Sequence, residues 1–209
     1  MEKLEKFSQI VKKGNYVFHL HTNLTDGRST LLEYFELAKK IGKNFVFTEH
    51  IRKKATYDWK SYIDEVHKAG YLAGFEAKLT VNGDVDINKE AYENSDVLAI
   101  AIHSLNVKKY ETLVSLLRMS FDKYSDNEIP IVWVHPYTSS VEKKIVPDKV
   151  KYIKDVMNGF ESRIWIEFNI RRKNFSNEEV EKNAEFFKIV KGFDAHSVEE
   201  LIEMLNRQI

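Results

Sequence analysis

The sequence predicts an α/β fold in which parallel β-strands are covered by helices. Short apolar segments of strand length alternate with amphipathic segments of helical length, about seven times along the 209 residues. The apolar segments are continuous rather than alternating in polarity, which is typical of parallel strands buried on both faces. This pattern fits either a closed barrel or a doubly wound open sheet.

The chain opens with an amphipathic helix. Apolar residues recur at helical spacing over residues 2–13, and Gly14 ends the pattern. The length suits one hydrophobic core, and no linker or low-complexity segment interrupts the sequence. We therefore interpret residues 1–14 as a helix packed on a single domain formed by residues 15–209.

The remaining elements follow in order, each with boundary signals. The predicted strands comprise residues 16–20, 45–48, 72–75, 97–102, 131–134, 164–168 and 186–190. The predicted helices comprise residues 30–41, 58–69, 108–124, 148–158 and 176–185, and Ser197 begins a terminal helix. Ser29 is the expected N-cap of the first of these helices, which Gly42 ends. Asn82-Gly83 predicts a β-hairpin over residues 79–87.

Composition limits the function classes. Lysine plus arginine equals aspartate plus glutamate, at 32 each, so the balance does not indicate a non-specific nucleic-acid binder or a membrane-surface protein. There is no cysteine, so a metal would be held by imidazole and carboxylate groups. The N-terminus lacks the apolar core of a signal peptide, and no apolar run approaches membrane-spanning length. We therefore expect a cytoplasmic protein without a membrane partner.

The stretch from Tyr16 to Asp26 predicts a metal site. Its apolar first half reads as a buried strand that places His19 and His21 at its C-terminal end. Residues two apart on a strand share a face, so both imidazoles should point to one spot. Asp26 follows in a turn from which its carboxylate can reach the same spot. Two imidazoles and a carboxylate are a typical metal-ligand set.

The other histidines repeat this placement. The chain has histidines at positions 19, 21, 50, 67, 103, 135 and 196. All except His67, which lies within a predicted helix, fall at or just past the end of a predicted strand. Glu76 and Asp194 occupy equivalent positions. In a closed barrel these strand ends surround one axis, whereas the outer strands of an open sheet would lie too far apart to share ligands, so the histidines favour a barrel.

At this point the motifs resemble a known family. His19-x-His21 with Thr25-Asp26-Gly27, Thr48-Glu49-His50, Gly74-x-Glu76, His103, His135-Pro136 and Asp194-Ala195-His196 occur in the order found in the polymerase-and-histidinol-phosphatase (PHP) family of metal-dependent phosphoesterases. The resemblance spans about residues 16–197. It implies a distorted (β/α)₇ barrel with up to three divalent metal ions at the C-terminal ends of the strands.

The resemblance also implies how the ligands are shared. The first ion would be held by His19, His21, Glu76 and Asp194, the second by Glu76, His103 and His135, and the third by Asp26, His50 and His196. The catalytic group would be a metal-bridging hydroxide held by Glu76, His103, His135 and Asp194. Nitrogen and oxygen ligands suit zinc, manganese or iron, so the sequence leaves the metal open.

Two positions depart from the family pattern. Val17 stands where the family usually has aspartate, and Glu49 stands where it usually has aspartate before histidine. Neither is an implied ligand, so the predicted metal site is retained. The change at Val17 removes a carboxylate that could have supported a ligand.

The expected activity is hydrolysis of a small phosphomonoester by attack of the hydroxide on phosphorus. The residues predicted to contact substrate are Arg28, Arg52, Asn169, Arg171 and Arg172, all at the same rim. Arg171 or Arg172 is the preferred phosphate anchor, and Glu167 with Asn169 is expected to orient the leaving group.

Two alternatives remain open at this level. One is a phosphodiesterase or nuclease acting on short oligonucleotides or nucleoside bisphosphates, since zero net charge disfavours long polymers but not a dinucleotide. The other is a non-catalytic scaffold subunit, against which the intact ligand set argues. The oligomeric state cannot be inferred from the sequence.

Overall fold

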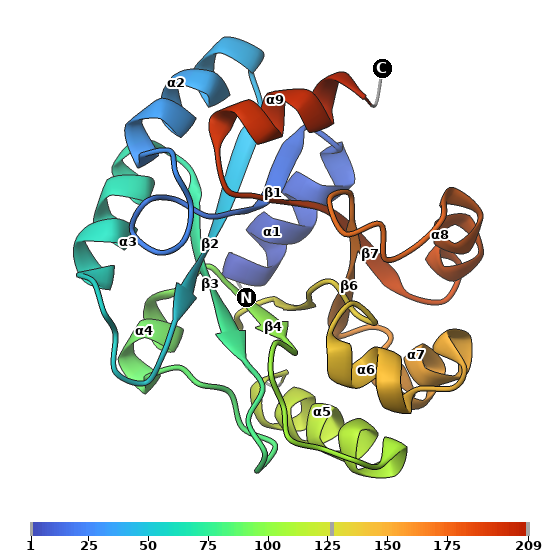
Figure 1. The fold of residues 1–209 in the computed structure, drawn as a ribbon. Helices are drawn as coiled ribbons and strands as arrows, with labels where there is room; N and C mark the ends of the chain where they lie inside the picture. The colour runs from blue at the N-terminus through green and yellow to red at the C-terminus, as the bar shows by residue number, and fades with distance from the viewer. Residues whose placement is uncertain (1, 126–127, 208–209) are drawn as a thin grey trace.

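The computed structural model describes residues 2–125 and 128–207, whose strands form a closed parallel barrel (Figure 1). The strands are β1 (Tyr16–Leu20), β2 (Asn44–Ile51), β3 (Leu72–Lys78), β4 (Val97–Ala101), β5 (Ile131–Trp133), β6 (Ile164–Asn169) and β7 (Lys188–Ala195). Each strand pairs in parallel with the next in sequence, and β7 pairs with β1. The predicted α/β barrel is confirmed.

Helices surround the ring of strands, except the first, which lies across the centre of the ring in the view of Figure 1. They are α1 (Glu2–Lys13), α2 (Leu31–Ile41), α3 (Trp59–Lys68), α4 (Lys89–Asn94), α5 (Tyr110–Tyr124), α6 (Ser140–Ile145), α7 (Lys149–Met157), α8 (Asn177–Ala184) and α9 (Val198–Asn206). Within the described ranges, none of them combines the length and the apolar character needed to cross a membrane.

Two apolar layers hold the barrel together. The larger lies between the strands and the helices and includes Phe45 and Trp133. The smaller fills the barrel interior with inward residues such as Phe18 and Val132. Phe7 of α1 belongs to this inner layer and packs edge-on against Phe18, with ring centroids 6.0 Å apart. The inner layer is apolar at the end of the barrel where α1 packs. The polar inward residues lie at the opposite end, where the strands have their C-termini.

The cap of α2 differs from the prediction. Thr30, not Ser29, is the N-cap: its hydroxyl accepts a hydrogen bond from the Glu33 backbone N–H, and the Glu33 carboxylate accepts one from the Thr30 N–H. The sequence offers two hydroxyl residues in a row, and Glu33 selects the one three positions before it. Ser29 instead accepts a hydrogen bond from the Val198 N–H at the start of α9.

The strands β2 and β3 each extend three residues beyond their predicted ends, and two other predicted β elements differ in form or position. The hairpin over 79–87 is reduced to one antiparallel bridge between Leu79 and Val85, with the Leu79 N–H bonded to the Ala101 carbonyl of the barrel. The last strand spans 188–195 rather than 186–190. Its apolar start suggested a short strand, but pairing with β6 and β1 continues through the polar residues that face the barrel mouth.

The short helices α4 and α6 were not predicted. Each has only six residues, too few for a helical repeat to show in the sequence. Both are nevertheless capped, by the side chains of Asn88 and Ser139.

Candidate metal centre

A cavity of about 510 Å³ lies at the C-terminal ends of the strands. Its lining includes seven of the nine predicted ligands, namely Asp26, His50, Glu76, His103, His135, Asp194 and His196. The two other predicted ligands, His19 and His21, are fully buried beneath them. All nine predicted ligand positions therefore lie in one region.

The end of β1 directs both of its histidines inward by an irregularity. Phe18 faces the barrel interior, so regular alternation would place the next inward side chain at Leu20. His19 instead adopts a left-handed backbone conformation, with φ of 72°, and the register with β7 shifts between Phe18 and Leu20. Leu20 consequently joins the outer core, and His19 and His21 both face the centre. The predicted convergence is present: alternation holds from His19 to His21, and the irregularity beside Phe18 sets their shared face inward.

His135 and Asp194 share this backbone feature, with φ of 33° and 52°. Left-handed conformations are uncommon for residues other than glycine and cost free energy that the surrounding fold must offset. Their presence at three candidate ligands on three different strands shows that the barrel mouth holds these side chains in imposed orientations.

The first predicted ligand set is compact. His19 Nε2 lies 2.9 Å from Glu76 Oε2 and 3.8 Å from Asp194 Oδ1. His21 Nε2 lies 3.2 Å and 3.6 Å from the same two oxygens. The ligand atoms of His19, His21 and Glu76 are close enough together to hold one ion, and Asp194 lies beside the two histidines.

Glu76 extends the cluster through its second oxygen. Glu76 Oε1 lies 2.7 Å from His103 Nε2 and 3.3 Å from His135 Nε2. Burial on its own would raise the pKa of this carboxyl, but hydrogen bonds from the surrounding histidines hold it well below its usual value. An ionised carboxylate with one oxygen facing each set has the geometry of a bridging ligand.

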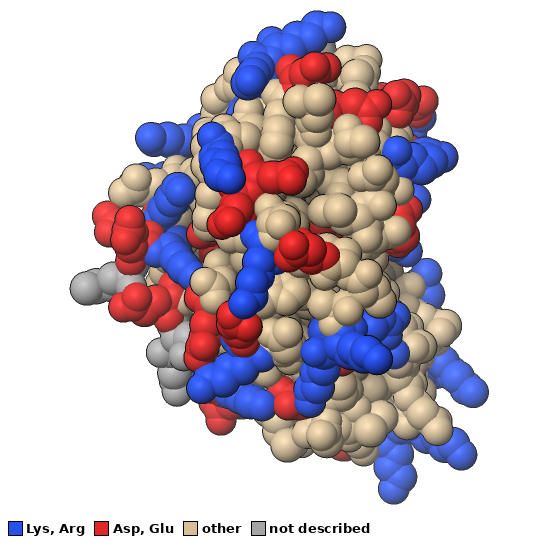
Figure 2. Space-filling model, turned by 90° about the vertical axis from the view of Figure 1, so that its left-hand side faces the viewer, with Lys and Arg blue, Asp and Glu red and all other residues tan. Residues whose placement is uncertain are grey.

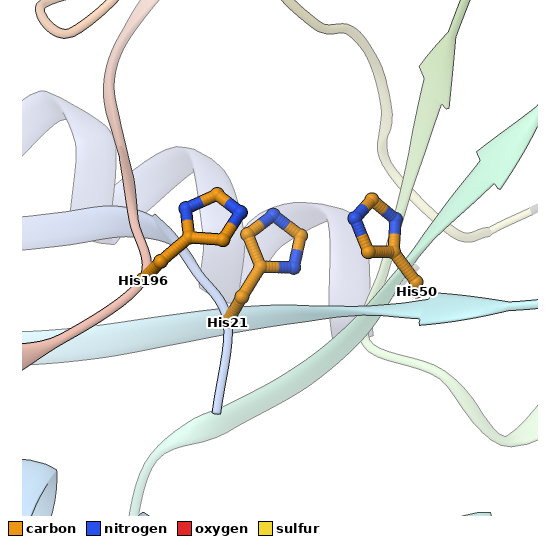
Figure 3. A group of neighbouring side chains, drawn as sticks. All are labelled: His21, His50 and His196. Carbon is orange, nitrogen blue, oxygen red and sulfur yellow. The ribbon is translucent and has the colours of Figure 1, made fainter. Parts of the chain in front are cut away.

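The third set lies nearer to solvent. His50 Nε2 and His196 Nε2 are each 3.3 Å from Asp26 Oδ2. Figure 3 shows His21, His50 and His196 side by side, carried by the end of β1, by β2 and by the segment after β7. His21 therefore stands between the first and the third set, and the three sets form one continuous cluster.

The donor groups fit a metal ion. Nδ1 of the fully buried His21 has no hydrogen-bond partner within the described residues, and its Nε2, 3.2 Å from Glu76 Oε2, lacks the alignment of a full hydrogen bond. Buried polar groups left in this state are rare in folded proteins. Burial lowers the pKa of His21 to about 4, so its imidazole is neutral near pH 7. A neutral imidazole beside two carboxylates is the form that binds divalent ions.

Glu167 of β6 supports His19 from the side away from the cavity. Its Oε1 lies 2.6 Å from His19 Nδ1, and its Oε2 accepts the His135 backbone N–H at 2.6 Å. Glu167 therefore does not face the cavity, contrary to the expectation that it would orient the leaving group. A carboxylate on the outer nitrogen of a ligating histidine fixes the ring and its tautomer. Glu167 thus supplies, from another strand, the kind of support that Val17 cannot give.

Gly192 makes room for this carboxylate. A Cβ at that position would lie 1.8 Å from Glu167 Oε1, so any side chain on this inward position of β7 would displace Glu167. This dependence joins residues far apart in sequence and could not be read from the sequence alone.

Glu49 holds the loop that carries Asp26. It is fully buried and accepts hydrogen bonds from the Thr22 backbone N–H, at 2.6 Å, and from the Thr25 hydroxyl. Burial raises its pKa to about 7. Glu49 contacts no candidate ligand atom in the way Glu167 does, so the departure at this position affects the loop rather than the cluster.

The predicted substrate residues separate into two groups. Arg52 and Arg172 line the cavity, and Arg172 Nε lies 2.6 Å from Asp194 Oδ2. The others lie outside its lining: Arg28 pairs with Glu200 at 3.1 Å, Arg171 Nη1 lies 2.6 Å from His196 Nδ1, and the buried Asn169 donates to Glu167. Lys78 and Ser104, which the sequence analysis did not single out, also line the cavity.

Comparison with solved structures supports the fold. The chain resembles histidinol phosphate phosphatase from Lactococcus lactis subsp. lactis, with a TM-score of 0.58 and 12% identity over 92% of this chain and 93% of that one. It also resembles a family 2 AP endonuclease from Brucella melitensis, with a TM-score of 0.52 and 13% identity over 92% and 88% of the two chains. At such identities the likeness establishes the barrel and no activity. No protein-family model matches the chain, and no curated protein matches its sequence.

Proposed function

We propose that this protein is a metal-dependent phosphoesterase of the PHP type that hydrolyses a small phosphomonoester. The observation that carries the proposal is the sharing of Glu76: its two oxygens face two sets of imidazoles, and His21 connects these to a third set around Asp26. Clusters of this kind place several divalent ions within reach of one substrate group.

The chain's own residues suit a phosphoryl group. Divalent ions, when bound, would supply positive charge for the phosphoryl oxygens and lower the pKa of a coordinated water. Glu76 and Asp194 would hold the ions, and Glu167 would keep His19 oriented. Arg172 reaches the same cavity and uses only Nε on Asp194, so its terminal nitrogens can donate to phosphoryl oxygens.

Cavity size and surface charge support a small substrate. A cavity of about 510 Å³ is in the range of small-molecule sites. On the face shown in Figure 2, lysine and arginine side chains are interspersed with aspartate and glutamate rather than gathered in a continuous track. The structure of the lactococcal histidinol phosphate phosphatase holds zinc, L-histidinol and phosphate, which makes zinc the first metal to test here.

The test is phosphate release from a panel of phosphomonoesters, measured beside cleavage of short oligonucleotides, after loading with zinc, manganese or iron. We expect turnover of small esters by the wild type and a loss of at least about a hundredfold in His19→Ala, because that variant removes a ligand of the first set. His67→Ala is the matched control, since His67 lies on α3 and bonds Asp96 instead.

Cleavage of oligonucleotides without turnover of small esters would select the nuclease alternative. Metal-loaded protein with no turnover of either class would select the scaffold. Full activity in His19→Ala would contradict the proposed site.

A further inference from the structure

Lys78 and Ser104 form a polar pair on the cavity wall that none of the three ligand sets uses. Lys78 is the last residue of β3 and lies two positions beyond Glu76, so alternation places both side chains on the inward face. Ser104 directly follows His103 after β4. Lys78 Nζ donates a hydrogen bond to Ser104 Oγ at 3.0 Å, which joins the ends of two neighbouring strands at the mouth.

Lys78 differs from the other cationic groups of the cavity. Arg172 Nε is 2.6 Å from Asp194, and Arg52 Nη1 is 3.8 Å from Asp86. Within residues 2–125 and 128–207, no carboxylate oxygen lies within 4.0 Å of Lys78 Nζ. Lys78 is half-buried. Its bond to Ser104 is exposed, so the ammonium group is accessible at the cavity mouth and can pair with an anionic group of a bound ligand.

The pair also has unused hydrogen-bond donors. An ammonium group has three N–H donors, of which Ser104 takes one. Because Ser104 Oγ accepts that bond, its own hydroxyl proton is left to donate to a further acceptor. Donors of this kind, arranged around one point, match the oxygens of a phosphate or a carboxylate.

We propose that Lys78 and Ser104 bind a second acidic group of the substrate, a phosphate or a carboxylate, beyond the ester that is cleaved. The inference rests on the proposed phosphoesterase function, because it takes the metal ligands as the position of the first phosphate. Lys78 lies two positions beyond Glu76, about 7 Å along the strand backbone, so the second acidic group would lie within a few bonds of the first. The substrate class is therefore a small molecule with two acidic groups rather than a neutral or cationic ester.

Three non-hydrolysable probes with the same three-carbon chain test this directly. They are propylphosphonate, propane-1,3-bisphosphonate and 4-phosphonobutyrate, and their binding to the metal-loaded protein is measured by calorimetry. We expect the two doubly acidic probes to bind about tenfold more tightly than propylphosphonate, as one added charge-assisted contact predicts. Comparing the bisphosphonate with the phosphonocarboxylate shows which second group the site prefers.

Variants test whether the tighter binding of the doubly acidic probes depends on Lys78. Lys78→Met keeps the aliphatic stem and should remove the tenfold gain, and Lys78→Arg should retain it. Lys12→Met, at an exposed position on α1, is the matched control that should also retain it. Equal binding of all three probes, or an undiminished gain in Lys78→Met, would overturn the subsite while leaving the phosphoesterase proposal intact. Failure of every probe, propylphosphonate included, would overturn both.

Discussion

At the residue scale, the candidate centre depends on groups that would not contact a metal. Glu167 bonds the outer nitrogen of His19 and the backbone of His135, so one buried carboxylate orients candidate ligands from two strands. This arrangement requires a glycine at position 192, because a side chain there would clash with the Glu167 carboxylate. The metal affinity of the site should therefore depend on residues outside the ligand sets.

Glu167→Gln tests this dependence. In the wild type, the Glu167 carboxylate favours a proton on His19 Nδ1, which leaves Nε2 free to bind a metal. The glutamine amide occupies the same space but lacks the negative charge that selects this tautomer. We expect metal affinity to fall about 10- to 100-fold, measured by competition with a chelator. Glu181→Gln, at an exposed position on α8, should leave metal affinity unchanged. Equal affinities in the two variants would show that Glu167 does not support the site.

At the scale of elements, the segment between β3 and α4 is held to α5 by a cluster of charges. Asp84 Oδ1 accepts hydrogen bonds from Lys123 Nζ at 2.8 Å and from the Tyr124 hydroxyl at 2.7 Å. Lys53 Nζ lies 3.7 Å from Asp84 Oδ2. Burial alone would raise the pKa of Asp84, but the bonds from Lys123 and Tyr124 lower it to about 2.

The lowered pKa predicts a pH dependence of stability. Because the folded-state pKa lies below the ordinary aspartate pKa of 3.8, the contribution of Asp84 is fully present above about pH 4 and is lost as the pH falls through about 2. Asp84→Asn should cost about 1 kcal/mol of unfolding free energy at pH 7, and the difference from wild type should shrink at pH 3 and below. Urea unfolding at both pH values measures it, and a difference that stays constant with pH would exclude this origin.

The β1 strand shows where sequence reasoning about elements succeeds and where it fails. The apolar run from Tyr16 to Leu20 predicted the strand with its observed bounds. The inward direction of His19 and His21 depends on a left-handed residue and a register shift, which are set by pairing with β7. Pairing between β1 and β7 joins residues far apart in the sequence. The local pattern could therefore predict that the two histidines share a face, but it could not predict the backbone irregularity that turns this face inward.

At the scale of the whole molecule, the positions of the histidines were the main sequence evidence for the closed barrel and for the ligand cluster. Residues that end strands in a closed barrel must meet at one mouth, so placing histidines after five strands was enough to predict both the barrel and the cluster. The supporting residues were harder to foresee. The role of Glu167 depends on side-chain packing inside the barrel, and the separation of Arg172 from Arg171 depends on which way a short turn faces. Neither leaves a periodic signal in the sequence.

The account's central claim is that Glu76 joins two of the three ligand sets and that His21 connects them to the third. Counting bound metal per protein after saturation and desalting tests it most directly, in wild type, Asp26→Asn and Glu76→Gln. We predict that the wild type retains up to three ions, that Asp26→Asn loses only the outermost one, and that Glu76→Gln loses the two that its carboxylate would join. A wild type that retains no metal, or a Glu76→Gln variant that retains as much as the wild type, would contradict the claim.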